Sequence, residues 1–172
     1  MPDKPTSLFQ AAWVVNDLGE AMRRWIATAR VGPFFVVSHV KVERVKYRGA
    51  AAPLDFSSAL AQAGPIQIEL IEQHGDRPSA YRDAFPRGKE GFHHVAMMTQ
   101  TYDADLERYR SEGNVAATEG MFGDMRFAYV DTRAQLGHMT EIIDDCESIK
   151  KIFKMVADAA VDWDGSDPIR YV

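Results

Sequence analysis

Four polar side chains with metal-binding chemistry stand in strand-like apolar segments of this chain: Gln10, Glu69, His94 and Glu141. An unpaired carboxylate in an apolar strand costs several kcal/mol unless it is neutralised or bound, and a divalent cation supplies that compensation. Taken together, an amide, two carboxylates and an imidazole could hold one such ion.

The donor set also narrows the choice of ion. Four nitrogen and oxygen donors leave room for one or two waters, which suits Zn, Ni, Co, Mn or Fe. A structural zinc site would instead prefer cysteine and histidine in a closed tetrahedron. Each residue alone has an ordinary explanation, such as an edge-strand glutamine, a core histidine or an outward-facing glutamate. Their recurrence in the order amide, carboxylate, imidazole, carboxylate, in two similar halves, favours a metal site.

Two adjacent histidines compete for the imidazole position. Side chains on a strand alternate between its two faces, so only one of His93 and His94 should face the metal. His94 matches the position of Gln10 in the other half of the chain. We therefore expect His94 to be the ligand and His93 to face the opposite side.

The elements that must position these residues form a repeated βαβββ pattern over residues 7–72 and 91–145, joined by a linker over 73–90. In the first half, residues 8–15 predict a strand, Asn16 or Asp17 caps a helix to about Arg30, and strands follow within 34–48, 54–61 and 66–72. In the second half, a strand over 92–99 and a helix over 104–112 precede strands near 115–119, 126–131 and 139–143. The linker holds one helical turn at 80–84.

The predicted fold class is α+β: two βαβββ modules form a curved mixed sheet around a metal-binding cleft, as a single domain over residues 1–172. A final helix from Ser148 to about Ala160 has apolar residues on one face and is expected on the outside. The segment Asp162–Val172 is expected to be a loosely packed tail.

Composition excludes several classes of protein. The formal net charge of −5 argues against nucleic acid, which requires a basic face. Apolar runs fall far short of the roughly 20 residues that span a bilayer, so no membrane partner is expected. The start of the chain, Met1–Pro5, has no apolar signal core, and a single cysteine, Cys146, fits a reducing compartment. These features predict a cytoplasmic protein.

Three segments carry a resemblance to a known family: Gln10–Leu18, Gly91–Ala96 and Gly137–Ile143. They resemble the vicinal oxygen chelate superfamily, also called the glyoxalase/bleomycin resistance/dioxygenase superfamily. That superfamily includes glyoxalase I, methylmalonyl-CoA epimerase, extradiol dioxygenases and antibiotic-resistance proteins. The resemblance covers about residues 7–145 and implies paired βαβββ modules, a metal held by the first and last strand of each module, and a homodimer.

Within that superfamily, the set Gln10, Glu69, His94 and Glu141 resembles the ligands of eukaryotic-type glyoxalase I, whereas Gly91-Phe-His-His looks more like the epimerase. Glyoxalase I of that type has an arginine four residues before the ligand histidine, for the glutathione carboxylate. Glu90 stands there in this chain, which disfavours a glutathione thioester. An extradiol dioxygenase is expected to use two histidines and one glutamate, and Gln10 occupies the first histidine's place.

The chemistry expected of such a site is proton transfer next to a carbonyl group. The metal acts as a Lewis acid, and Glu141 or Glu69 removes the proton, with His39, Glu43 and His138 as the next candidates for the base. The product stays open between epimerisation, isomerisation and elimination. The rival hypotheses are a non-enzymatic binder of small apolar compounds and an iron-dependent extradiol-type dioxygenase.

Side chains for the substrate are harder to assign. A bulky apolar or aromatic substrate is suggested by the residues Trp13, Phe34, Phe35, Phe56, Met97, Met98, Met121, Phe122 and Phe127. An anionic group could instead be bound by basic residues, namely Arg44, Lys46, Arg48, Arg126 and Arg133. The segment Gly120–Asp124 resembles a lid.

Overall fold

The computed structural model describes residues 7–172 and divides the chain into two halves followed by a C-terminal segment. The elements of the first half are β1 (Leu8–Val14), α1 (Leu18–Ala29), β2 (Phe34–Val37), β3 (Glu43–Tyr47), β4 (Ala50–Ala51), β5 (Phe56–Ala63) and β6 (Ile66–Gln73). The linker holds α2 (Ala80–Ala84). The remaining elements are β7 (Gly91–Thr99), α3 (Tyr102–Ser111), β8 (Ala116–Phe122), β9 (Met125–Val130), α4 (Arg133–Leu136), β10 (Met139–Asp144), α5 (Glu147–Ala160) and β11 (Ile169–Tyr171).

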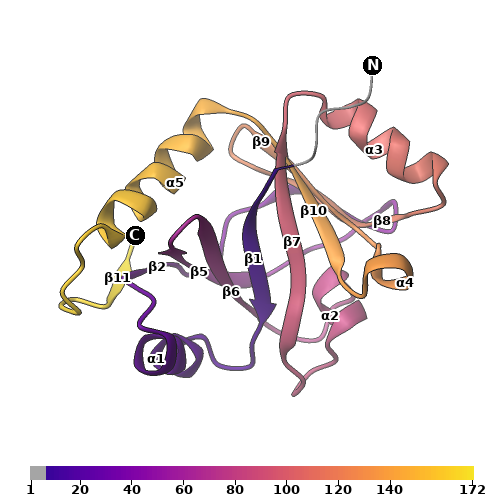
Figure 1. The fold of residues 1–172 in the computed structure, drawn as a ribbon. Coiled ribbons are helices and arrows are strands. Elements are labelled where there is room, and N and C mark those ends of the chain that lie inside the picture. Colours follow the sequence, from indigo (N-terminus) through magenta and orange to yellow (C-terminus); the bar gives the residue numbers. More distant parts are fainter. Residues whose placement is uncertain (1–6) are drawn as a thin grey trace.

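All the described strands belong to one mixed sheet, in the order β11-β2-β5-β6-β1-β7-β10-β9-β8-β3-β4. The two halves meet at its centre, where β1 and β7 run antiparallel. The other neighbour of β1 is β6, and the other neighbour of β7 is β10; both of these pairs are parallel. Two equivalent units, β1-α1-β2-β5-β6 and β7-α3-β8-β9-β10, therefore lie side by side in an open, curved sheet (Figure 1). The predicted α+β fold is confirmed.

The β3–β4 hairpin does not stay with its own half. The first-half segment 34–48 divides after β2, and β3 pairs antiparallel with β8 of the second half, with Glu43 opposite Met121 and Tyr47 opposite Thr118. Alternating apolar residues predict a strand but do not say which sheet edge it joins. The hairpin thus links the two halves at a second place besides β1 and β7.

Helices α1 and α3 cover one face of the sheet, which we call the outer face; the opposite face, which Ala12 and Glu69 share, is the inner face. Leu18 and Met22 of α1 pack on Ile68 and Leu70 of β6, which flank Glu69 and so point away from it. Leu106 of α3 belongs to the corresponding cluster in the second half. Asp17, one of the two predicted caps, accepts a hydrogen bond from the Glu20 amide at the start of α1.

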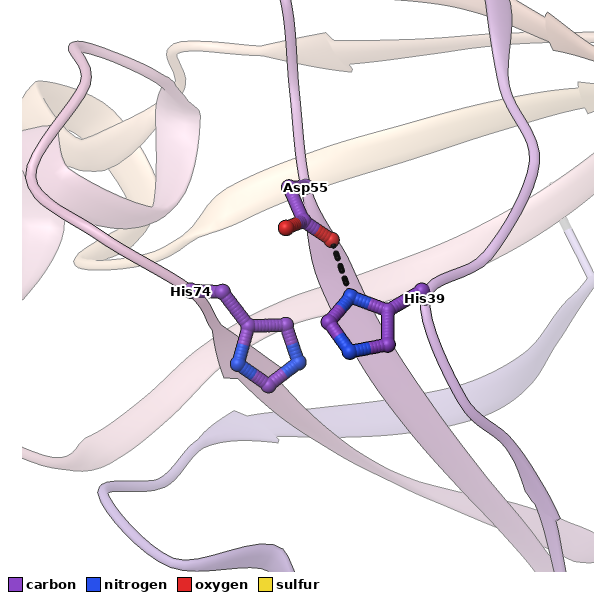
Figure 2. Close-up of side chains that lie close together, drawn as sticks. All are labelled: His39, Asp55 and His74. Carbon is purple, nitrogen blue, oxygen red and sulfur yellow. Dashed lines mark hydrogen bonds and ion pairs between the residues drawn. The ribbon is translucent and has the colours of Figure 1, made fainter.

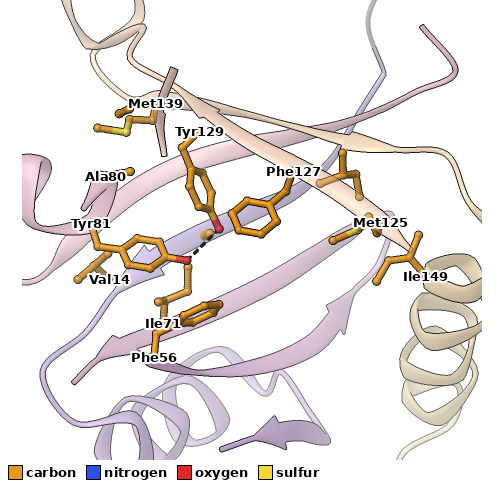
Figure 3. Packing of buried hydrophobic residues seen from close by; sticks show 13 residues of the cluster. Val14, Phe56, Ile71, Ala80, Tyr81, Met125, Phe127, Tyr129, Met139 and Ile149 are labelled. Atoms are coloured by element: carbon orange, nitrogen blue, oxygen red, sulfur yellow. Dashed lines mark hydrogen bonds between the residues drawn. The ribbon is translucent and has the colours of Figure 1, made fainter. Parts of the chain in front are cut away.

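Helix α5 lies on the inner face of the sheet, and the expectation that it packs outside was wrong. Ile149 joins the core cluster that contains Phe127 and Ile143 (Figure 3), and the Phe153 ring lies 5.2 Å from that of Phe9. An amphipathic helix has the same sequence pattern whichever apolar surface it covers. Here the inner face would be exposed without it, and hydrophobic burial places α5 there.

The C-terminal segment is also more ordered than the predicted loose tail. Strand β11 pairs in parallel with β2, and the amide of Val172 donates to the carbonyl of Val36. Trp163 lies against Gly32, where an added Cβ would come within 2.6 Å of its ring. Among the helices of residues 7–172, none combines the length and hydrophobicity needed to cross a membrane.

We expect Gly120→Ala to destabilise the fold. Gly120 of β8 is buried, and a Cβ there would lie 2.7 Å from the Phe127 ring and 3.3 Å from Val45 of the β3 strand. Overpacking of this kind costs about 1–3 kcal/mol. Urea unfolding measures the loss of free energy of unfolding.

Gly19→Ala is the matched control for that change. A Cβ on Gly19 would meet only ordinary contacts, 3.4 Å from Asp17 and 3.5 Å from Arg23, and alanine favours helix. This variant should be neutral or more stable than the wild type. Equal losses in both variants would contradict the packing of β3 on β8 described here.

Candidate metal centre

The centre of the sheet brings three ionisable side chains to one point. On β1, Ala12 is paired with Glu69 on one side and with His94 on the other, and paired residues face the same side of the sheet. Because the Ala12 side chain is small, Glu69 Oε2 and His94 Nε2 approach to 3.6 Å across it. Glu141 reaches the same point from β10, with Oε2 3.2 Å from His94 Nε2.

These three residues could hold a metal ion. Each offers one ligand atom, and the three atoms lie within 4.8 Å of one another. The His94 side chain is fully buried, and those of Glu69 and Glu141 are 12% and 9% exposed. Ser58 Oγ donates to Glu69 Oε1 at 2.7 Å, which orients the carboxylate so that Oε2 faces His94.

Gln10 borders the same cavity as Glu69 and Glu141. Its amide nitrogen donates to Gln67 Oε1 at 2.7 Å. The carbonyl oxygen is then the atom that Gln10 can offer to an ion. Three of the four residues predicted to be ligands therefore line one cavity, and the fourth, His94, lies within 3.6 Å of two of them.

His93 also points to the inner side, contrary to the expected alternation. Ala12 is opposite His94 and Trp13 is opposite Phe92, so His93 is an extra residue in a bulge of β7. A bulge locally breaks the alternation of side chains. The His93 ring accordingly lies 5.6 Å from that of Tyr129, which is on the inner face.

Hydrogen bonds to His93 determine which nitrogen of His94 is free. His93 Nε2 lies 3.0 Å from the carbonyl oxygen of Ala80, an acceptor only, so Nε2 carries a proton. Burial and the charge of His94 lower the pKa of His93 to about 3, so its ring is neutral and Nδ1 is an acceptor. His94 Nδ1 is 2.8 Å from it and must donate. A histidine that binds a metal must be neutral, so an ion would replace the proton on Nε2, and Nε2 is the nitrogen that would offer its lone pair to the ion.

The chemistry of this cluster fits a cation. Within residues 7–172, His94 Nε2 is a buried nitrogen that makes no hydrogen bond. Burial alone would lower the pKa of His94, but the adjoining Glu141 and Glu69 carboxylates outweigh it and raise this pKa to about 9. Burial raises the pKa of Glu141; His94 opposes that effect, and the charge of Glu69 adds to it. A divalent ion would satisfy Nε2 and neutralise both carboxylates.

Two buried tyrosines complete the polar part of the site. Tyr129 is paired with Glu141, its ring lies 5.0 Å from that of His94, and its hydroxyl is 2.9 Å from that of Tyr81 (Figure 3). Burial and the nearby carboxylates raise the pKa of both phenols, so they stay protonated. Sequence reasoning did not single out these tyrosines or Ser58, although alternation from Phe127 places Tyr129 on the same face.

The cavity above these residues has a volume of about 320 Å³ and is mostly apolar. Its polar lining consists of Gln10, Ser58, Glu69, Tyr129 and Glu141. Helix α5 closes one side with Ile149, Ile152 and Phe153. Of the aromatic residues suggested for the substrate, Phe56, Phe122 and Phe127 line it, whereas Trp13 and Phe34 belong to the core under α1.

The suggested anion-binding residues do not line this cavity. Within the described chain its lining includes no arginine or lysine. Arg126 pairs with Asp144 and Asp103, and Arg48 pairs with Asp83 and Asp131. Gly120–Asp124, suggested as a lid, is the end of β8 and its turn into β9. Of the alternative bases, His39 lies in a separate cluster with Asp55 and His74 (Figure 2).

Comparison with known proteins agrees with this geometry. Residues 9–129 match the family described as the glyoxalase/bleomycin resistance protein/dioxygenase superfamily. That segment contains Gln10, Glu69 and His94, while Glu141 lies beyond it. No curated protein matches the sequence.

Solved structures share the fold at low identity. A hypothetical protein from Bacillus halodurans is 16% identical, with a TM-score of 0.56 over 84% of this chain and 97% of its own. Methylmalonyl-CoA epimerase from Mycobacterium tuberculosis is 16% identical, with a TM-score of 0.53 over 84% and 91%. A methylmalonyl-CoA epimerase in complex with methylmalonyl-CoA is 18% identical, with a TM-score of 0.51 over 83% and 96%. This chain belongs to the glyoxalase/bleomycin resistance protein/dioxygenase superfamily, the vicinal oxygen chelate proteins.

Proposed function

We propose that this protein is a divalent-metal-dependent enzyme that catalyses carboxylate-assisted proton transfer on a small apolar carbonyl compound. The observation that carries the proposal is the buried cluster of three potential ligands, in which His94 Nε2 lies 3.2 Å from Glu141 Oε2 and 3.6 Å from Glu69 Oε2. Gln10, Glu69, His94 and Glu141 would hold the ion, which is one of Zn, Ni, Co, Mn or Fe. When bound, the ion supplies Lewis acidity that makes the C–H next to the substrate carbonyl more acidic.

The protein's own residues then move the proton. Glu141 is the proposed base, because burial raises its pKa and so makes it a stronger acceptor. Glu69, oriented by Ser58, is the candidate for the second proton transfer. Return of the proton to the opposite face gives an epimerase, return to the adjacent carbon gives an isomerase, and loss of a β-substituent gives a lyase.

The cavity supports an uncharged substrate. The acyl group of methylmalonyl-CoA, the ligand in one structural neighbour, carries a carboxylate. A buried carboxylate needs a cationic partner, and the lining of this cavity in residues 7–172 offers no lysine or arginine. We therefore propose an apolar or aromatic carbonyl compound. The homodimer implied by the family resemblance and the cytoplasmic location indicated by the composition stay predictions.

The two rival functions differ in how they use the site. A non-enzymatic binding protein is favoured by the apolar lining and would bind substrate analogues without proton exchange. The dioxygenase hypothesis needs a second histidine ligand. His93, the only neighbouring histidine on that side of the described chain, already bonds to His94 and Ala80.

We expect purified protein to bind about one divalent ion per chain at this centre, and His94→Ala to lose most of it because the only nitrogen ligand is gone. Metal analysis after dialysis measures the content. Glu107→Ala, which removes a 73% exposed carboxylate on α3, is the control and should keep the ion. Unchanged content in His94→Ala would place the ion elsewhere.

His93→Phe should weaken metal binding about 10–100-fold, the usual effect of losing a hydrogen-bond partner of a metal ligand. Phenylalanine preserves the ring packing on Tyr81 and Tyr129 but leaves the His94 Nδ1–H without an acceptor. Competition with a chelator gives the affinity. His138→Phe is the control, since the only hydrogen bond of the His138 side chain among the described residues is to the Met139 carbonyl. Equal affinity in both variants would show that His94 does not depend on His93.

Glu141→Gln should retain the ion but reduce exchange of the substrate C–H with solvent deuterium by about 10²–10⁴-fold, the usual contribution of a general base. Glutamine preserves an oxygen ligand and removes the proton acceptor. Exchange is followed by NMR on apolar ketones, with and without chelator, beside Glu69→Gln. Full exchange in both variants with the ion bound would rule out these carboxylates as bases, and binding without exchange in the wild type would favour the non-enzymatic function.

A further inference from the structure

A second group of potential metal ligands lies away from the central site. His39 follows β2, Asp55 precedes β5 and His74 follows β6, and one ligand atom from each lies within 4.8 Å of the others. His39 Nδ1 is 2.7 Å from Asp55 Oδ1, and the two imidazole rings are stacked 4.4 Å apart (Figure 2). The three side chains thus come together from three separate segments.

This cluster is on the opposite face of the sheet from the central site. Ser57 and Ser58 are neighbours on β5 and point to opposite faces. Ser58 bonds to Glu69 in the central site, whereas Ser57 Oγ lies 2.8 Å from His74 Nε2. The two sites therefore share no ligand, and each can be tested without the other.

The backbone supports the arrangement of the cluster. His39 has φ +49°, a left-handed conformation that is uncommon outside glycine, and its amide donates to Ser57 Oγ at 3.1 Å. The amide of His74 donates to the carbonyl of Asp55. A strained backbone held in place by its surroundings is more frequent at functional sites than elsewhere.

Solvent access favours a metal site here over the active site of a serine hydrolase. Ser57 beside His74 resembles a nucleophile with its base, but Ser57 is only 6% exposed and its hydroxyl already accepts a bond from His39. The His39 and Asp55 side chains are 58% and 55% exposed. A solvated ion can therefore reach the imidazole and carboxylate groups, while a substrate cannot reach the serine.

We propose that His39, Asp55 and His74 form a second, solvent-accessible site for a divalent transition metal, best suited to Zn²⁺. Two imidazoles and one carboxylate are ligands that zinc accepts, with water in the remaining position. An ion bound to His39 Nδ1 would replace the hydrogen bond between Nδ1 and Asp55 Oδ1, and the neutral imidazole would then carry its proton on Nε2. The ion would join the loop after β2 to β5 and β6, and so stabilise the edge of the first half where the chain leaves for the β3–β4 hairpin.

The experiment is equilibrium dialysis of the full chain against Zn²⁺ alone, followed by metal analysis. The wild type should bind about two Zn²⁺ per chain, and His39→Asn and His74→Phe about one each. Asparagine tolerates the left-handed backbone of His39, and phenylalanine preserves the ring stacking of His74, so both variants should fold. Circular dichroism checks that they do. Asp76→Asn is the control: Asp76 is 61% exposed and pairs with Arg87, and this variant should bind as the wild type does.

Two outcomes separate this site from the central one. If His39→Asn and His74→Phe bind as much Zn²⁺ as the wild type, the second site does not exist. If His94→Ala binds as much as the wild type while the His39 and His74 variants lose an ion, the second site stands and the central one fails. Thermal melting gives an independent readout, because Zn²⁺ should raise the melting temperature of His94→Ala but not that of the double variant with His74→Phe.

Discussion

The close approach of Glu69, His94 and Glu141 is the constraint on which the rest of the structure depends. Two carboxylates and one imidazole nitrogen meet on a buried sheet face, at 3.2 and 3.6 Å from His94 Nε2. Such a group is unfavourable in an apolar core unless its charges are compensated. The surrounding residues hold it in that position: Ala12 leaves space between the strands, Ser58 orients Glu69, and the Ala80 carbonyl orients His94 through His93.

This constraint explains why two modules are needed. Glu69 comes from the first and His94 and Glu141 from the second, so the site exists only where β1 and β7 pair. Two further elements tie the modules together around that pairing. The β3–β4 hairpin crosses to β8, and helix α5 covers the inner face. Parallel neighbours β6 and β10 then carry one carboxylate each to opposite sides of His94. A small change in the register of β1 against β7 would separate the ligands.

The sequence was sufficient for the repeated pattern because it depends on local spacing. Alternation and helical periodicity located β1, α1, β6, β7 and β10, and with them the four predicted ligands. The sequence was insufficient wherever the position of an element or side chain depends on residues far away in the chain. The pattern of β3 fits either sheet edge, and the apolar face of α5 fits either side of the sheet. The orientation of His93 depends on a bulge, which an alternating pattern conceals because one extra residue reverses the faces that follow.

The two polar clusters of this sheet differ in what their surroundings permit. The central one is nearly excluded from water and opens only to an apolar cavity, so an ion there would interact strongly with a substrate carbonyl. The cluster of His39, Asp55 and His74 lies in solvent, where the same charges are screened and polarise a substrate weakly. Ligand chemistry is similar at both places, with imidazole and carboxylate donors. Burial, rather than the identity of the donors, is therefore the reason for proposing catalysis at the inner face and only a structural role for the outer cluster.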